Sequence, residues 1–321
     1  MKLSRVFAVA LSLAAVQGHA ADVYPSKPIR MVIPFPAGGP TDVSGRLFAE
    51  AMSAKLGQQV IVENKGGAGG TLGSAAVAVA APDGYTILYN TSSLLLGSML
   101  YKAVKFDPLK DFIPVARTAG TPLVVTVNPQ VPARTLAEFI AEARKRPGQW
   151  NYASSGSGVI DHLGGALLTQ RLEISMTHIP YKGTAPALVD LVGNSTQMMV
   201  TTLNTLLPFA RDKKLVPLAI ASLNRSPLLP DVPTVAEAAN LPNFEMTAWT
   251  GLVVPAGTPP AIVAKLNAAV NASIAQKEFV DKLRATGAEV YGGSSEEYAA
   301  YLRSELARWK SVIQSSGVTP Q

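Results

Sequence analysis

The chain has 321 residues, of which 48% are hydrophobic and 16% are charged. This length exceeds one ordinary core, and the composition is typical of a well-packed globular protein rather than a disordered one. The formal net charge is +6, but basic residues are scattered among acidic ones and form no block that could follow a phosphate backbone. We therefore expect no nucleic-acid partner, whereas a mildly positive surface suits an anionic solute.

The N-terminal segment predicts export. Lys2 and Arg5 precede the apolar stretch Val6–Val16, and small residues ending at Ala20 are typical of a signal-peptidase site. The stretch is shorter than the roughly 20 residues that a membrane-spanning helix needs, although a short membrane anchor is the alternative interpretation. We expect residues 1–20 to be a cleaved signal peptide and the mature protein to be periplasmic. The chain has no cysteine, so neither a disulfide nor a lipid-anchored cysteine is possible.

Short β-rich runs alternate with helical segments along the rest of the chain. Phe48 and Met52 lie on one face of a helix that Gly57 ends, and Ser294 with Glu297 forms a capping box before another helix. The alternation predicts an α/β fold with parallel-rich sheets flanked by helices and right-handed crossovers. We predict strands at Ile29–Phe35, Val60–Glu63, Tyr85–Tyr89, Leu123–Val127, Asn151–Ser154, His178–Tyr181, Gln197–Thr201, Val216–Ala221, Gly251–Val254 and Glu289–Tyr291.

Two proline-rich stretches, Phe106–Pro122 and Ser226–Pro242, roughly bracket the middle third of the chain. If the chain crosses between domains at both places, the middle third forms one lobe and the outer thirds form the other. We expect lobe 1 to contain residues 22–124 and 244–321, and lobe 2 to contain residues 125–243. Ligands of open α/β sheets bind beyond the carboxyl ends of the strands, so the site is expected between facing loops of the two lobes.

Three strand-to-helix loops carry the candidate ligand-binding residues. Each combines glycine or hydroxyl residues with the start of a helix, where free amides and the helix dipole favour an anion. Some of these residues also have a purely structural interpretation in place of ligand binding: a tight turn at Gly38-Gly39, a helix cap at Thr41 or Asp42, and a solvated charge at Lys182. The candidates are Phe35, Ala37, Gly38, Gly39, Thr41 and Asp42 in the first loop, Ser154, Ser155, Gly156, Ser157 and Gly158 in the second, and Lys182 and Thr184 in the third.

The sequence resembles the Bug/TctC family, the extracytoplasmic receptors of tripartite tricarboxylate transporters. The resemblance covers essentially the whole mature chain in order, and its combined motifs are highly specific. It implies a two-lobed periplasmic-binding (Venus flytrap) fold that closes on a small mono-, di- or aromatic carboxylate and delivers it to a membrane permease. The motifs are YPSKPIR with PFPAGGPTD, VENKGGAGGTLG, APDGYT, KDFIPVA, NYASSGSG, HIPYKGTAPAL, LPDVPTVAE and VPAGTP.

The resemblance also implies roles for individual residues. The loop Phe35–Asp42 and the loop Ser154–Gly158 should grip the proximal carboxylate, largely through backbone amides, with help from Thr184. Where many relatives carry Gly-Gly-Gln-aliphatic-Asp, this chain has Gly193–Gln197, followed by Thr201 and Thr202 in place of a further acid. We count Thr201 and Thr202 among the candidate ligand-binding residues. Ala166 likewise stands where relatives often have Glu. Because these changes remove partners for an amino group, we expect a neutral or purely acidic solute rather than an amino acid.

Other functions fit the residues less well. A dinucleotide fingerprint at Gly67, Gly69 and Gly73 has Leu72 at its third glycine position, and no acidic residue follows the next strand to hold a ribose. A hydrolase with a Ser-His-Asp triad from Ser155 or Ser157, His162 and Asp161 is disfavoured, because adjacent Asp161 and His162 would point about 100° apart on a helix. We expect no enzyme activity, no cofactor and no metal, and a monomer. A periplasmic sensor that signals to a membrane protein remains an open alternative to transport.

Overall fold

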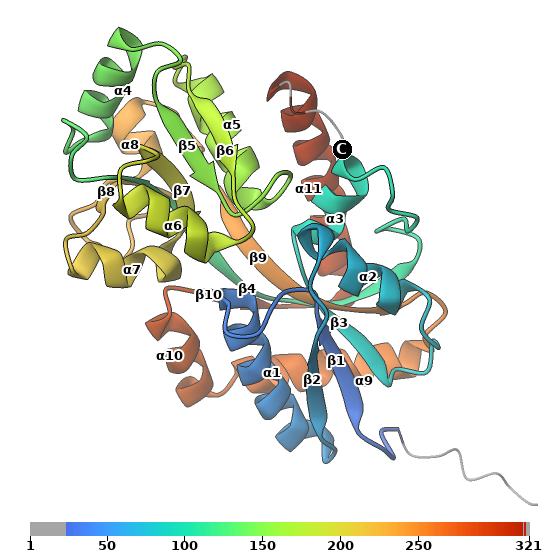
Figure 1. The fold of residues 1–321 in the computed structure, drawn as a ribbon. Helices are drawn as coiled ribbons and strands as arrows, with labels where there is room; N and C mark the ends of the chain where they lie inside the picture. The colour runs from blue at the N-terminus through green and yellow to red at the C-terminus, as the bar shows by residue number, and fades with distance from the viewer. Residues whose placement is uncertain (1–23, 317, 319–321) are drawn as a thin grey trace, which may run out of the picture.

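The computed structural model describes residues 24–316 and residue 318. The predicted signal peptide lies outside the described residues. Ten strands form one continuous, strongly curled sheet with helices on both sides, and the sheet divides into two halves, here called lobe 1 and lobe 2 (Figure 1). The two-lobed α/β architecture expected from the sequence is therefore confirmed.

Lobe 1 is built on the strand order β2-β1-β3-β9-β4, with β10 added beside β4. The pairs β1–β2 and β1–β3 are parallel, whereas β9 and β10 run antiparallel to their neighbours. Because β1, β2 and β3 are parallel, the loops that follow them leave the same edge of the sheet. The strands are β1 (Ile29–Ile33), β2 (Val60–Asn64), β3 (Thr86–Thr91), β4 (Phe112–Val127), β9 (Thr247–Pro255) and β10 (Glu289–Gly292).

Helices cover both faces of the lobe 1 sheet. One face packs a core around Phe48 and Phe279, and the other packs a core around Leu94 and Tyr298. The helices of the first face are α1 (Pro40–Leu56), α9 (Pro260–Ile274) and α10 (Lys277–Ala285); those of the second are α2 (Thr71–Ala78), preceded by the short 3₁₀ helix η1 (Ala68–Gly70), α3 (Ser93–Leu100) and α11 (Ser295–Ser316).

Lobe 2 repeats this plan with a smaller sheet. Its strand β5 (Asn151–Ser154) pairs in parallel with β6 (Thr177–Pro180) and β7 (Met198–Thr202), while β7 and β8 (Val216–Ala221) run antiparallel to β4. Two buried clusters, around Phe139 and around Leu206, fill its two faces. Its helices are α4 (Leu136–Lys145), α5 (Ile160–Arg171), α6 (Thr184–Val192), α7 (Leu203–Arg211) and α8 (Val235–Ala239).

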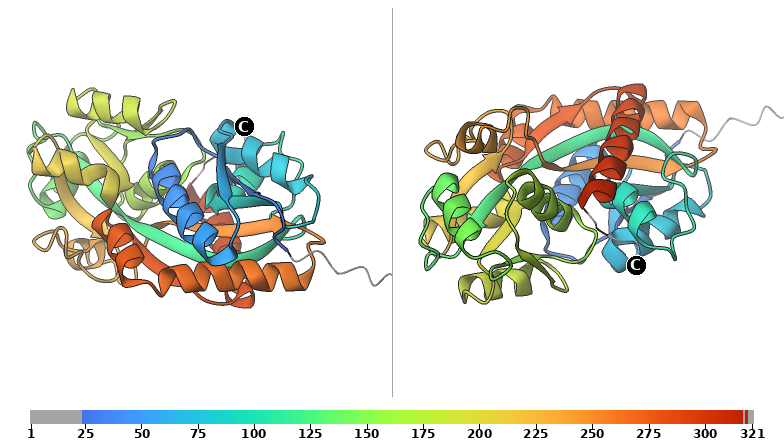
Figure 2. Two further views of the ribbon diagram at one scale, coloured as in Figure 1. Left: turned by 90° about the horizontal axis from the view of Figure 1, so that it is seen from below. Right: turned by 90° about the horizontal axis from the view of Figure 1, so that it is seen from above.

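Strand β4 joins the two lobes and runs through both of them (Figure 2). Its first part, as far as Pro122, pairs with β9 of lobe 1, and its last part, from Leu123, pairs with β7 and β8 of lobe 2. The chain returns beside this point, where Met246 bonds both Leu123 and Ala221 through its backbone. This change of partners supports our proposal that the lobes comprise residues 22–124 with 244–321 and residues 125–243.

All ten predicted strands are present, but the extent of β4 was missed. The proline-rich segment after Phe106, where we expected the chain to cross between the lobes, also supplies the long first part of β4. The strand accommodates Pro114 at an irregularity in its pairing and Pro122 where it changes partners, which are positions where a missing backbone N–H is tolerated. The predicted capping box of Ser294 and Glu297 is present, with reciprocal hydrogen bonds at the start of α11.

Candidate functional site

The first candidate loop connects β1 to α1 and is shaped by Asp42. The helix starts at Pro40 with Gly39 as its N-cap residue, so the alternative in which Thr41 or Asp42 caps the helix is wrong. The buried Asp42 carboxylate instead accepts three hydrogen bonds, from the Gly38 amide (2.9 Å), Arg46 Nε (2.9 Å) and Asn64 Nδ2 (2.8 Å). Burial would raise the pKa of this carboxyl, but the hydrogen bonds outweigh it and lower the pKa.

The side chain of Asp42 is therefore committed to holding the loop in shape. The other residues of the loop are more exposed than Asp42: Ala37 and Gly38 are exposed, and Phe35, Gly39 and Thr41 are partly exposed. Within the described part of the chain, the amide groups of Ala37 and Gly39 have no protein acceptor. The backbone of this loop, rather than the Asp42 carboxylate, is what it presents to a ligand.

A second glycine-rich segment, between β2 and α2, packs against the first loop. A Cβ atom at Gly73 would lie 2.6 Å from the Lys65 carbonyl and 2.9 Å from Pro34 Cα, so only glycine allows this approach. Asn64 also donates to the Phe35 carbonyl (3.0 Å). Gly73, weighed above in a dinucleotide fingerprint, thus has a packing role beside the β1–α1 loop.

The loop between β5 and α5 lies at the matching edge of lobe 2. The Ser155 amide donates to Asp161 (2.7 Å), and the Gly158 amide donates to Nδ1 of His162 (3.0 Å). Asp161 is buried, which raises its pKa to about 6 even though backbone amides favour its charged form. Ser154 is fully buried and lies with its Oγ 2.6 Å from Nε2 of His178.

The β1–α1 and β5–α5 loops share one geometry. Gly38 and Gly158 both adopt a left-handed backbone conformation, with φ of 82° and 75°. Each lies one residue before the N-cap and donates its amide to the side chain four residues later, which is Asp42 in lobe 1 and His162 in lobe 2. The flanking amides, of Ala37 and Gly39 in one loop and Ser157 and Val159 in the other, have no protein acceptor among the described residues.

The third candidate loop joins the second directly. The amides of Tyr181 and Gly183 donate to the carbonyls of Ser154 (3.0 Å) and Ser155 (2.9 Å). Lys182 is exposed and forms no ion pair within the described residues, and Thr184 is the first residue of α6. The structure therefore brings the second and third predicted loops together into one surface.

The two threonines at the end of β7 are less clearly part of the site. Thr201 is buried and pairs with Val124 in the sheet, while the Thr202 hydroxyl lies 2.8 Å from that of Thr205 at the start of α7. No described hydrogen bond connects either threonine to the three loops. Their place in the ligand site remains a prediction.

Tyr101, which the sequence did not single out, lies between the lobes. It follows α3 of lobe 1, and its hydroxyl donates to the Ser157 carbonyl of lobe 2 (2.9 Å). Figure 1 shows the β5–α5 loop reaching toward α3 at this point. Beside it lies a buried apolar cluster that α3, α5 and α11 build together, comprising Leu96, Leu100, Leu163, Trp309 and Val312.

The Ser-His-Asp alternative fails on geometry. Asp161 accepts from the backbone amides of Ser155 and His162, so its carboxylate orients no imidazole ring. The close pair Ser154–His178 has a serine that is fully buried and that donates to the Gly156 carbonyl (2.9 Å). An attacking hydroxyl needs access to substrate, which this one lacks.

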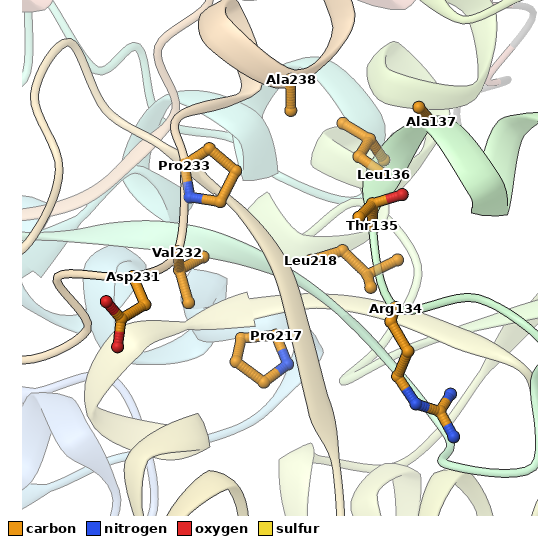
Figure 3. A pocket seen from close by; sticks show the side chains of 10 residues that line it. All are labelled: Arg134, Thr135, Leu136, Ala137, Pro217, Leu218, Asp231, Val232, Pro233 and Ala238. Carbon is orange, nitrogen blue, oxygen red and sulfur yellow. The ribbon is translucent and has the colours of Figure 1, made fainter.

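A hollow of about 470 Å³ lies elsewhere in lobe 2, between the start of α4, β8 and the segment leading to α8 (Figure 3). Arg134 and Asp231 lie on its rim, but the Arg134 guanidinium is engaged by the carbonyls of Pro129, Val131 and Ala133. No residue of the three loops lines this hollow. Among the described residues, no helix is long and apolar enough to span a membrane.

The model of the tripartite tricarboxylate transporter family receptors (TctC) matches residues 45–318. The chain belongs to this family. A protein from the tcbD–tcbE intergenic region of a Pseudomonas species is 39% identical over 306 residues, which cover 95% of this chain and 91% of the relative. The family consists of solute-binding proteins, not enzymes.

Solved structures extend the likeness to the whole fold. The structure of Rpa4515 from R. palustris with adipate has a TM-score of 0.87 and 33% identity, covering 93% of this chain and 100% of that one. MatC (Rpa3494) from Rhodopseudomonas palustris with bound malate has a TM-score of 0.80 and 36% identity, covering 90% and 100%. The family resemblance of the sequence is thereby confirmed.

Proposed function

We propose that this receptor captures a small carboxylate between its two lobes in the periplasm and delivers it to the membrane permease of a tripartite tricarboxylate-type transporter. The observation that carries the proposal is the matched pair of loops, one from each lobe. Each offers two unpaired backbone amides at the start of a helix, where the dipole adds positive potential. Such donors suit a carboxylate without requiring a cationic side chain.

Capture by closure is supported by how the lobes are joined. The lobes share strand β4 and the return of the chain near Met246, which allows them to move as two bodies about a narrow connection. Closure over a ligand excludes water, and amide–carboxylate hydrogen bonds strengthen as water leaves. Solved relatives with adipate and with malate support a carboxylate as the ligand.

The ligand itself is proposed to lack an amino group. The acidic side chains of the two loops are occupied: Asp42 pairs with Arg46, and Asp161 accepts two backbone amides. Asn194, Thr201 and Thr202 add no negative charge that would pair with an ammonium group. The proposed solutes are therefore mono-, di- or aromatic carboxylates rather than acidic amino acids.

A thermal-shift screen tests the function directly. The purified mature protein is unfolded and refolded to remove bound ligand, then heated with mono-, di- and tricarboxylates, aromatic acids, aspartate, glutamate and NAD. A ligand at about 100 times its dissociation constant stabilises the protein by about 2.7 kcal/mol, which raises Tm by several degrees. A shift with one class of simple acid supports the proposal; a shift with NAD or a neutral solute alone would overturn it, and preference for aspartate or glutamate would overturn the ligand class.

A further inference from the structure

Two buried histidines lie behind the β5–α5 loop. The rings of His162 in α5 and His178 in β6 are stacked, with centroids 3.7 Å apart and planes inclined by 12°. His178 also stacks against Tyr152, with centroids 5.0 Å apart. Neither histidine belongs to the ligand-binding residues considered above, but each contacts a different end of the loop.

Each ring anchors the loop through one nitrogen. Because Nδ1 of His162 accepts the Gly158 amide, this nitrogen carries no hydrogen and the ring is neutral with its hydrogen on Nε2. The Ser154 hydroxyl donates to the Gly156 carbonyl, so its hydrogen is already used. His178 Nε2, 2.6 Å away, therefore donates to the Ser154 oxygen.

The two anchors operate as one unit because the rings are in contact. Burial lowers the pKa of His162 to about 4. Burial, together with the neighbouring His162, lowers the pKa of His178 to about 3. Both rings are thus neutral at neutral pH, and for His162 the hydrogen bond accepted by Nδ1 requires it. Between the anchored ends lies the Ser157 amide, one of the unpaired donors of the site.

We propose that His162 and His178 are positioning residues that hold the β5–α5 loop in its anion-binding form, acting through Gly158 and Ser154 respectively. The inference rests on the proposed function, because it assigns the ligand to this loop. Lobe 1 supplies the comparison: there a charged group, Asp42, holds Gly38 in the same way. In lobe 2 the neutral His162 takes that place, which adds no negative charge beside the bound carboxylate.

Paired substitutions separate positioning from packing. H162N keeps an acceptor oxygen for the Gly158 amide, and H162L has similar bulk without one. H178Q likewise keeps a donor for Ser154, and H178L does not. With adipate and malate as probes in calorimetric titration, we expect Kd to rise at least tenfold in both leucine variants and to stay within about threefold of wild type in H162N and H178Q. Equal affinity losses in the leucine and the amide variants would overturn the proposal, as would full affinity in folded leucine variants.

Nuclear magnetic resonance provides a readout that needs no ligand. We expect the ¹⁵N spectrum to show both rings with hydrogen on Nε2, and the Gly158 amide to be protected from exchange in wild type and in H162N. If the leucine variants do not fold, these signals decide the matter: an unprotected Gly158 amide, or hydrogen on Nδ1 of His162, would overturn the proposal. Should wild type bind none of the acids, the proposed function fails, while ring states and protection still report on the anchoring of the loop.

Discussion

Tyr101 of lobe 1 donates a hydrogen bond to the carbonyl oxygen of Ser157 in lobe 2, with 2.9 Å between the two oxygen atoms. This contact links a residue beside α3 to the loop that we assign to the ligand. It lies next to the apolar cluster around Trp309, in which helices of both lobes meet. The contact can exist only while the lobes are close together, so it favours the closed form.

Replacing Tyr101 with Phe removes this hydrogen bond and little else. A hydrogen bond of this kind contributes about 0.5–1.5 kcal/mol, so we expect Kd to rise by about two- to tenfold in titration calorimetry. Tyr85→Phe is the matched control, because its hydroxyl contacts Ser26 on the far side of lobe 1. A Tyr101→Phe protein with wild-type affinity would show that the contact plays no part in closure.

Substitutions of Gly39 test whether the β1–α1 loop binds the ligand, and they should leave the fold intact. Its backbone has φ of −79°, and an added Cβ would contact only the Pro36 carbonyl, at 3.7 Å. We therefore expect Gly39→Ala and Gly39→Val to melt near the wild-type temperature but to bind progressively more weakly, because the side chain enters the space over the unpaired amides. Full affinity in the valine variant, measured on refolded protein, would remove this loop from the site.

Replacing Asp42 should cost much more folding stability than replacing Arg46, although the two residues form one ion pair. The buried Asp42 carboxylate accepts three hydrogen bonds, so Asp42→Ala removes all three and should lower the free energy of unfolding by about 1–3 kcal/mol. The variant should also bind ligand more weakly, because the loop loses the side chain that holds its shape. The Arg46 side chain is 52% exposed, so Arg46→Gln should cost less than about 1 kcal/mol. Urea unfolding at neutral pH measures both; equal costs would contradict the assigned role of Asp42.

His162 should make the protein sensitive to acid. The unfolded chain takes up a proton on this histidine below about pH 6.5, whereas burial lowers the pKa to about 4 in the folded protein. Stability should therefore fall as pH drops through this window, by about 2 kcal/mol at pH 5. Asp161, with its pKa raised to about 6, acts in the opposite direction, and His178, with its pKa lowered to about 3, acts in the same direction as His162. Both residues are present in both proteins compared. We expect H162N to lose less stability than wild type between pH 7 and pH 5 in urea unfolding; parallel losses would contradict a buried neutral ring.

Lys182 should influence the rate of capture more than the final contacts. It is exposed beside the second loop and has no ion-pair partner among the described residues. A charge of this kind attracts an anionic ligand over about one Debye length. We expect Lys182→Gln to lower the association rate by about two- to threefold at low salt and to leave it nearly unchanged at 0.5 M salt, in stopped-flow fluorescence. A salt-independent loss would instead indicate direct contact with the ligand.

The sequence predicts the elements well where their signals are local. Asn151–Ser154 and Val216–Ala221 were predicted with the bounds that β5 and β8 have, because short apolar runs between turn residues identify buried strands. The first part of β4 was missed because Pro114 and Pro122 are typical of loops, and only its pairing with β9 explains why a strand tolerates them.

For the site, the sequence predicts which loops are involved but not the side chains that hold those loops in shape. Glycines beside helix starts identified the loops at Gly38 and Gly158, but the partners that shape them come from other elements. Asn64 reaches Asp42 from β2, and His178 reaches Ser154 from β6. Tyr101 contacts a residue far along the chain, and no local pattern marks it. Such contacts depend on how the strands are ordered in the sheet, which periodicity does not reveal.

One measurement tests the central claim most directly: calorimetric titration of the refolded protein with adipate and, in parallel, with adipamide, repeated with malate and its diamide. The amides keep the size and chain of the acids but lack their charge. If unpaired backbone amides of the two lobes grip a carboxylate, at least one acid binds and its diamide binds at least 100-fold more weakly. Equal binding of an acid and its amide, or binding of the amides alone, would contradict carboxylate capture by these loops.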